Sequence, residues 1–236
     1  MRNHDHKSGK TPRTLIFVQV NSVDEALLAV QAWKADVLVA QGMSTTLQPL
    51  IDPEKNIIVA TVCPVSGIES GGHGSASAPP VINLVPQILS ALPPSGAPPV
   101  LAAGGLSSGA HLAAFLTLGA AGAVVGTRFL LAQESLYSDV QKRAIIAAKS
   151  GSAVRSYIFD QLRDTTGWPA GVDGRALAMP AVAAVETGAD IARMKEEVAE
   201  GAKRGDIHSV IAWAGTGVGQ VDRPQPAKVT PPYLPA

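Results

Sequence analysis

Residues 100–134, VLAAGGLSSGAHLAAFLTLGAAGAVVGTRFLLAQE, decide the fold. Two short apolar runs, 100–103 and 121–125, flank a segment that has serine N-cap residues before it and glycine after it, so we expect a helix over about 110–118. The apolar runs are continuous rather than alternating, which is typical of strands covered on both faces. The stretch therefore predicts a strand–helix–strand unit of a parallel sheet.

Both expected strands end in residues suited to an anion. Gly104 and Gly105 follow the first strand, and Gly126 and Thr127 follow the second. Glycine lets an anion approach the backbone, and the amide groups of a turn that leads into a helix carry partial positive charge. Either doublet alone is equally well explained by a tight turn. Together they predict that two neighbouring strand tips hold one phosphate, as the last two loops of a (β/α)8 barrel do.

The same stretch resembles the flavin-phosphate segment of the nitronate monooxygenase family, formerly called 2-nitropropane dioxygenases, which are FMN-dependent (β/α)8 barrels. The resemblance implies that the phosphate of FMN contacts six residues, namely Gly104, Gly105, Val124, Val125, Gly126 and Thr127. Arg128 and Phe129, which follow, also fit the family motif. Because other FMN barrels share this motif, it indicates the superfamily and leaves the substrate open.

Composition limits the classes of function. The chain has 236 residues, 46% of them hydrophobic, which is enough for one domain with a sizeable core. Lys and Arg together number 19, as do Asp and Glu, so no net field would attract nucleic acid or an anionic membrane. One cysteine, Cys63, excludes an internal disulfide framework. Without a long apolar run or a signal peptide, we expect a soluble cytoplasmic protein that binds a small molecule.

Two more strands are expected at 14–20 and 36–40, joined by a helix that Ser22 caps. The second strand ends at Gln41, at the position where barrel active sites lie. This segment also resembles the family, which implies that Gln41 contacts the flavin. On its own, a glutamine at a strand end would be a weak indication.

Residues 69–74, ESGGHG, form the expected catalytic loop. Their glycines allow the backbone to pass close to a flat cofactor. A lone histidine is more often structural than catalytic. The resemblance implies that Gly71 lies against FMN and that His73 acts at the substrate, as a general base or as a hydrogen-bond donor to the nitro group.

The C-terminal third is expected to hold a helix at 133–148, a loop-like segment at 159–180 and an amphipathic helix at 190–203. Three aspartates in 159–180 lack the spacing of a calcium loop, so no metal is expected. The G-x-G-x-G at 215–219 lacks the strand and helix of a dinucleotide-binding fingerprint.

The chain as a whole is expected to be a partial α/β barrel over 13–221, between a disordered arm at 1–12 and a disordered proline-rich tail at 222–236. Four βα units are expected, whereas a closed (β/α)8 barrel needs eight, so we expect the C-terminal half of a barrel plus a helical and loop extension. An open edge strand favours self-association. It would also leave the cofactor site open, so the isolated chain is expected to bind FMN weakly or not at all.

The resemblance implies oxidation of an alkyl nitronate with dioxygen, in which FMN carries the electrons. Another FMN barrel, such as an enoyl or quinone reductase, is the alternative enzyme. A non-catalytic fragment that keeps only the phosphate-binding half is the alternative from another class.

Residues 43–67 interrupt the resemblance, because the family pattern runs from the Gln-Gly pair directly into the GGH loop. One hypothesis is a translated intron. The other is a genuine loop insertion, which barrels tolerate, with 56–62 as an extra strand.

The intron hypothesis predicts the donor-like codons GGT ATG AGT at 42–44 and the acceptor-containing TCA GGN at 66–67. Sequencing the gene and its transcript checks this, and a spliced transcript without the block is expected. Other codons at these positions, or a spliced transcript that keeps the block, would contradict the hypothesis.

Overall fold

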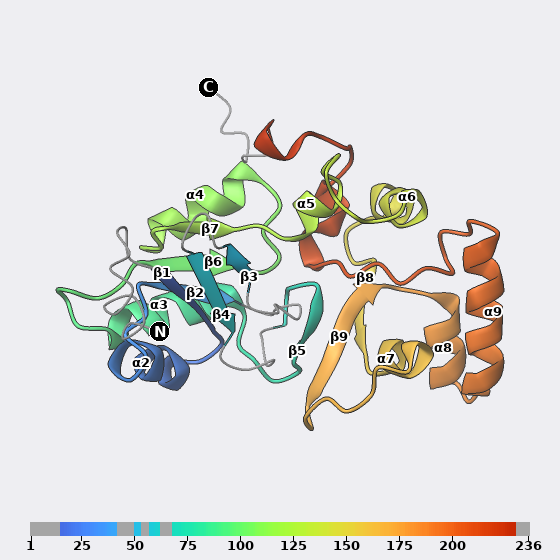
Figure 1. The fold of residues 1–236 in the computed structure, drawn as a ribbon, viewed down its shortest axis with the longest axis horizontal. Coiled ribbons are helices and arrows are strands. Elements are labelled where there is room, and N and C mark those ends of the chain that lie inside the picture. The colour runs from blue at the N-terminus through green and yellow to red at the C-terminus, as the bar shows by residue number, and fades with distance from the viewer. Residues whose placement is uncertain (1–14, 42–49, 53–56, 62–67, 230–236) are drawn as a thin grey trace.

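The computed structural model describes residues 15–41, 50–52, 57–61 and 68–229, and the strands in these ranges form two sheets (Figure 1). The first sheet has the order β3-β4-β1-β2-β6-β7, and the second has the order β5-β9-β8. The strands of the first sheet are β1 Leu15–Val20, β2 Val37–Gln41, β3 Leu50–Asp52, β4 Ile57–Thr61, β6 Val100–Ala103 and β7 Gly122–Val124. Those of the second sheet are β5 Gly72–Ser75, β8 Ala153–Ser156 and β9 Val172–Leu177.

Four strands of the first sheet follow the expected alternation of strand and helix. β1, β2, β6 and β7 lie side by side in the sheet in the same order as along the chain, and each pairs in parallel with the next. The helices between them are α2 Val23–Gln31, α3 Val81–Ala91 and α4 Gly109–Thr117. The expected α/β fold with a parallel sheet is therefore confirmed. Within the described ranges this sheet is open, with β3 and β7 at its edges.

Serine side chains begin two of these helices, as the sequence predicts. Ser22 Oγ accepts a hydrogen bond from the amide of Glu25 at 3.2 Å, and Ser108 Oγ accepts one from the amide of His111 at 3.4 Å. Each bond satisfies an amide group that the first turn of a helix leaves without an intrahelical partner.

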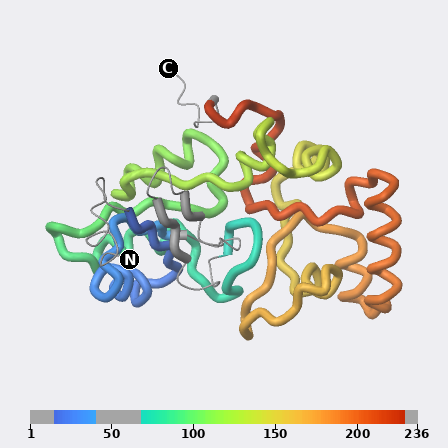
Figure 2. The backbone as a smooth tube through the Cα atoms, viewed as in Figure 1, coloured from blue at the N-terminus to red at the C-terminus, as the bar shows by residue number. Residues whose placement is uncertain are grey.

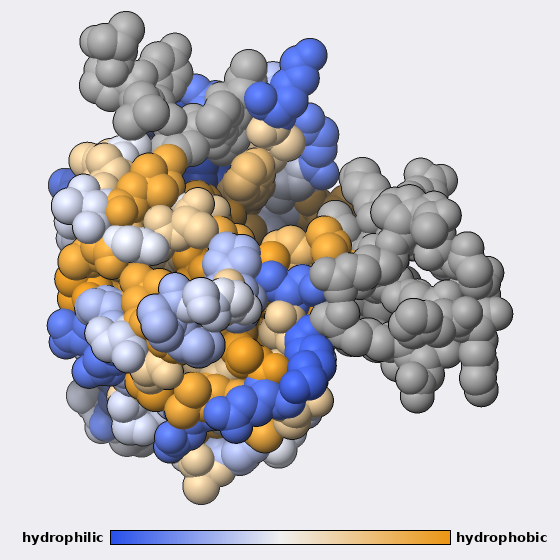
Figure 3. Space-filling model, turned by 90° about the vertical axis from the view of Figure 1, so that its left-hand side faces the viewer, coloured by the Kyte–Doolittle hydropathy of each residue, from blue (hydrophilic) through white to orange (hydrophobic). Residues whose placement is uncertain are grey.

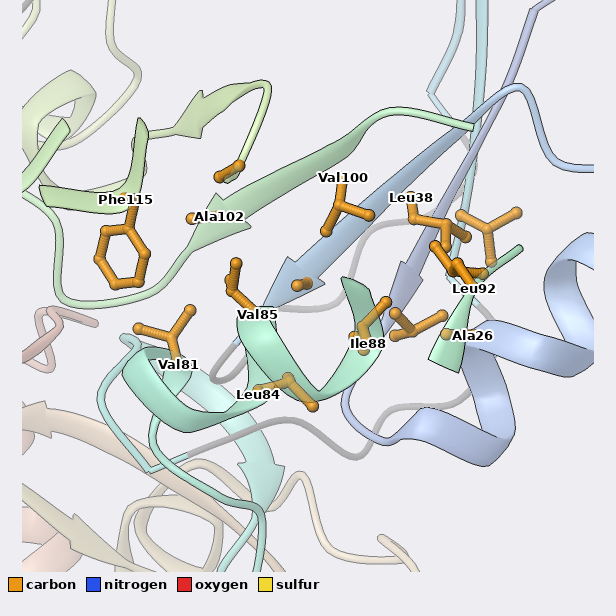
Figure 4. Close-up of a cluster of buried hydrophobic side chains, with 14 of the residues drawn as sticks. Ala26, Leu38, Val81, Leu84, Val85, Ile88, Leu92, Val100, Ala102 and Phe115 are labelled. Atoms are coloured by element: carbon orange, nitrogen blue, oxygen red, sulfur yellow. The ribbon is translucent and has the colours of Figure 1, made fainter. Parts of the chain in front are cut away.

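The main core lies between α3 and the parallel strands (Figure 4). α3 carries apolar side chains along one face at helical spacing, and these side chains point toward β2 and β6. The buried side chains of this layer include Val81, Leu84, Val85 and Ile88 from α3 and Leu38, Val100 and Ala102 from the strands. Burial of this face fixes α3 against the sheet.

Part of the interrupting block belongs to the first sheet. β4 pairs in parallel with β1, and β3 pairs antiparallel with β4. The extra strand expected at 56–62 is therefore confirmed. β1 is therefore not an edge strand, because β4 pairs with it, and the edge on this side is β3. On the opposite side, β7 has no further strand partner among the described residues.

The structure corrects three local expectations. The segment 159–180 is not a loop, because it contains α7 Ile158–Arg163 and β9. The helix expected at 133–148 is α6 Asp139–Ala147, since Ser138 and Gln141 form a capping box that starts the helix there. The second half of the expected catalytic loop, residues 72–74, belongs to β5, which pairs antiparallel with β9. This pairing joins segments about 100 residues apart, so local sequence does not encode it.

The chain after β9 packs beside the second sheet and then returns to the first (Figure 2). The elements after β9 are α8 Pro180–Glu186, α9 Ile191–Lys203 and the 3-10 helices η1 Thr216–Gln220 and η2 Ala227–Val229. A further short helix, α5 Thr127–Leu130, follows β7. On the way back, Trp213 forms an isolated bridge with Ala176 of β9. Near the C-terminus, the amide of Ala227 donates to the carboxylate of Glu134. Residues 1–12 lie outside the described residues.

The surface mixes hydrophobic and hydrophilic residues on the face that carries α2 and α3 (Figure 3). Exposed apolar side chains of these two helices include Leu28 and Ile82. Apolar side chains scattered in this way are usual on a protein surface. No helix in the described ranges is long and apolar enough to cross a membrane.

The packing of α3 makes a testable difference between two of its residues. Leu84 is fully buried and Ile82 is 47% exposed. We expect Leu84→Ala to lower the free energy of unfolding by about 2–5 kcal/mol, because it leaves a cavity against the sheet. Ile82→Ala is the matched control and should change it by less than about 1 kcal/mol. Urea denaturation followed by circular dichroism measures both, and equal losses would contradict this packing.

Candidate functional site

The parallel ladder brings the predicted strand tips together. Gln41 is in register with Ala103, and Ala103 is in register with Val124. The carboxyl ends of β2, β6 and β7 therefore lie side by side. Gly104-Gly105 after β6 and Gly126-Thr127 after β7 are consequently on neighbouring strand ends, as expected. The side chain of Gln41 lies outside the described residues.

The glycines at these tips differ in their backbone conformation and in the space around them. Gly104 has φ 109° and Gly105 has φ 71°, which are left-handed conformations that favour glycine. A Cβ on Gly105 would also lie 2.7 Å from the Thr216 hydroxyl oxygen. A Cβ on Gly126 would have no neighbour within 4 Å. The first tip is therefore fixed and packed, whereas the second tip has open space above it.

The backbone of residues 214–217 lies directly on both tips. The amide of Gly215 donates to Thr127 Oγ1 at 2.9 Å. A Cβ on Gly217 would stand 2.4 Å from the carbonyl oxygen of Gly105. The glycines of the G-x-G-x-G motif thus permit close backbone packing at the expected phosphate site. The motif does not fit a dinucleotide fingerprint, and its position at the strand tips was not predicted from the sequence, although its spaced glycines were the available signal.

Residues 69–71 join the same contact region. The amide of Thr216 donates to the carbonyl oxygen of Glu69 at 2.8 Å. A Cβ on Gly71 would lie 2.6 Å from the carbonyl carbon of Ala214, so Gly71 packs against backbone here. The Glu69 carboxylate accepts from the amide of Val81 at 2.7 Å at the start of α3. Burial raises the pKa of the Glu69 carboxyl, and this hydrogen bond partly offsets the effect.

His73 lies in β5 and is only 5% exposed. Its Nε2 is 2.7 Å from Oδ1 of Asp160, which is fully buried. The imidazole ring stacks on Trp168, with ring centroids 4.1 Å apart and 17° between the planes. The ring of Trp213 lies 4.8 Å from that of His73. These residues, with Thr165, are called the histidine cluster below.

Two clusters therefore stand close along the chain. The tip cluster consists of Gly104, Gly105, Gly126 and Thr127, and residues 214–217 contact it at Gly105 and Thr127. Trp213, which belongs to the histidine cluster, directly precedes the segment 214–217 that contacts the tips. His73 was predicted from the sequence as a site residue, whereas Trp168 and Trp213 were not, and Asp160 was considered only as a metal ligand. Within the described ranges, no group of three or more His, Cys, Asp or Glu side chains could hold a metal ion.

Tyr137 fixes the backbone at Trp213. The amide of Trp213 donates to the Tyr137 hydroxyl at 3.2 Å, and that hydroxyl donates to the carbonyl oxygen of Trp213 at 3.5 Å. Burial raises the pKa of the Tyr137 phenol to about 12, so the group stays a neutral donor at physiological pH.

Residues 58–229 match the family model for nitronate monooxygenase. The chain belongs to the nitronate monooxygenase family. Its similarity to "Nitronate monooxygenase npaC" of Metarhizium robertsii is 35% identity over 93% of this chain and 57% of that protein. A nitronate monooxygenase of Neurospora crassa is 30% identical over 90% of this chain and 51% of its own length. The chain thus spans about half the length of these relatives.

Solved structures of other proteins share the fold. FabK from Thermotoga maritima has a TM-score of 0.62 at 25% identity, over 95% of this chain and 60% of that one. Nitroalkane oxidase from Streptomyces ansochromogenes has a TM-score of 0.60 at 27% identity, over 91% of this chain and 54% of that one. The resemblance drawn from the sequence, to the nitronate monooxygenase family, is therefore confirmed.

Gly174 provides a test of the histidine cluster in this family member. A Cβ on Gly174 would lie 2.4 Å from the Trp213 ring and 3.5 Å from His73 Nε2. We expect Gly174→Ala to shift the tryptophan emission and to lower the free energy of unfolding by about 1–3 kcal/mol. Gly126→Ala, at an open position, is the control and should change it by less than about 0.5 kcal/mol. Fluorescence-detected denaturation measures both. An unperturbed Gly174→Ala protein would contradict the packing of Trp213 on β9.

Proposed function

We propose that this protein is an FMN-dependent nitronate monooxygenase, which oxidises alkyl nitronates with dioxygen. In this proposal β1, β2, β6 and β7 are four consecutive strands of a (β/α)8 barrel. The observation that carries the proposal is the adjacency of the two glycine-bearing tips after β6 and β7. Family membership supports the chemistry, because the relatives are named for nitronate oxidation.

The tip cluster fits the phosphate group of FMN. In the described part of the chain, the amides of Gly105, Gly126 and Thr127 have no hydrogen-bond acceptor. Because Thr127 Oγ1 accepts from Gly215, its own hydroxyl hydrogen can be donated to an anion. Gly126 has space above it for such a group. We propose that these groups and Gly104 hold the phosphate, with Val124 and Val125 contributing backbone. Gln41 and Gly71 would lie nearer the flavin ring.

Bound FMN would supply the electron transfer. The residues of the chain would bind and orient the flavin and move a proton at the substrate. We propose His73 for the proton transfer. Its ring stacks on Trp168, has Trp213 as a tilted neighbour and is largely shielded from water.

A second candidate function is that of another FMN barrel, an enoyl or quinone reductase. The TM-scores to FabK, 0.62, and to nitroalkane oxidase, 0.60, are nearly the same, so the fold alone does not separate the two functions. A third reading is a non-catalytic chain that binds only the phosphate. We also propose that the chain self-associates through the β7 edge and is located in the cytoplasm.

Flavin titration tests the phosphate site. We expect the purified chain to lose FMN on gel filtration but to quench flavin fluorescence in titrations, with FMN preferred over riboflavin. Gly126→Glu should weaken FMN binding at least about tenfold, because it sets a carboxylate beside the phosphate. Riboflavin binding should not change, and Gly126→Ala controls for the loss of glycine. Equal binding of FMN and riboflavin by the wild-type chain would contradict the site. Flavin absorbance retained through gel filtration would contradict the weak binding.

Oxygen uptake with excess FMN separates the candidate reactions. Uptake on addition of propyl-1-nitronate, without NADH or NADPH, is the expected result. Rapid oxidation of a nicotinamide cofactor with an enoyl thioester or a quinone would favour the reductase. Binding of FMN without any turnover would favour the non-catalytic reading.

A further inference from the structure

The contact between His73 and Asp160 specifies where the imidazole hydrogen lies. Nε2 of His73 is 2.7 Å from Oδ1 of Asp160, and both side chains are buried. A carboxylate oxygen accepts hydrogen bonds, so Nε2 must be the donor nitrogen. In the neutral ring the other nitrogen, Nδ1, then carries the basic lone pair.

Oδ1 of Asp160 is committed to an acceptor role by two more donors. The Thr165 hydroxyl lies 2.9 Å from it, and the indole N–H of Trp168 lies 3.2 Å from it. Asp160 itself sits in the first turn of α7, and its carbonyl oxygen accepts from the amide of Thr165. Three donors converge on this oxygen, so it acts as the acceptor and the imidazole nitrogen acts as the donor.

The plane of the His73 ring is fixed independently. Trp168 stacks on the ring and also donates to Asp160, so one side chain sets both the plane and the carboxylate. Gly174 of β9 has no Cβ, which leaves room for the Trp213 ring and for Nε2 of His73 to pack against this strand. Rotation of the imidazole would break the hydrogen bond as well as the stacking.

This arrangement carries a cost that packing alone does not explain. Oδ2 of Asp160 has no hydrogen-bond partner among the described residues, although Asp160 is fully buried. A buried polar atom without a partner destabilises a fold, because it has lost its hydrogen bonds to water and gained none in return. A costly buried carboxylate against a histidine is more typical of a functional site than of a core.

We propose that Asp160 is the positioning residue of His73: it keeps the hydrogen on Nε2 and makes Nδ1 the nitrogen that exchanges a proton with the substrate. The inference rests on the proposed function, in which His73 acts at the substrate. With a neutral nitroalkane, the C–H bond next to the nitro group breaks and its proton forms an N–H bond at Nδ1. The electron pair stays on the nitronate, and the Asp160 carboxylate faces the resulting imidazolium.

The tautomer of His73 tests the inference directly. We would record long-range ¹H–¹⁵N spectra of ¹⁵N-labelled protein at a pH where the ring is neutral, with His73 assigned by its loss in His73→Gln. The wild-type ring should be the Nε2–H tautomer. Asp160→Asn should lose this single tautomer, because an amide can donate as well as accept. Thr165→Val removes a different donor to the same oxygen and should keep the tautomer.

The result that overturns the inference is a wild-type Nδ1–H ring, or an Asp160→Asn spectrum identical to wild type in a folded protein. If Asp160→Asn does not fold, the wild-type tautomer alone decides. A wild-type Nε2–H ring supports the inference whether or not nitronate is consumed, whereas an Nδ1–H ring overturns it even in an active enzyme. In an active protein, Asp160→Asn should also lower kcat for nitroalkanes about 10–100-fold with little change in KM.

Discussion

The parallel register of β2, β6 and β7 is the constraint on which the site depends. Because β6 pairs with β2 on one side and β7 on the other, the three strands end at one edge of the sheet. The crossover helices make this arrangement possible, and burial of α3 against the strands holds it. A shift of either pairing by one residue would turn the strand faces over and separate the tips. The anion-binding potential of the glycine turns thus follows from strand pairing.

The return of the chain after α9 connects the two sheets to one site. Trp213 packs on β9 and on His73, and two residues later the amide of Gly215 reaches Thr127. The same short segment therefore fixes the distance between the histidine cluster and the tip cluster. Its glycines allow backbone-to-backbone contact, so larger residues there would force the clusters apart.

Local patterns predicted the parts of the molecule that local interactions form. The strands at 14–20, 36–40 and 100–103 and the helices capped by Ser22 and Ser108 were predicted because apolar runs and N-cap residues act within a few positions. The pairing of β5 with β9 was not predicted, because it joins distant segments. Asp160 was noticed only as a weak metal candidate, since its meeting with His73 depends on that pairing. The strand tips were predicted, whereas the backbone that contacts them was not.

The most direct test of this account is a backbone amide spectrum of the protein recorded during a titration with FMN. The account predicts that the amide resonances of Gly104 and Gly105 shift together with those of Gly126 and Thr127, and that riboflavin, which lacks the phosphate, leaves them in place. Shifts at one tip without the other, or the same shifts with riboflavin, would contradict the claim that the two tips hold one phosphate.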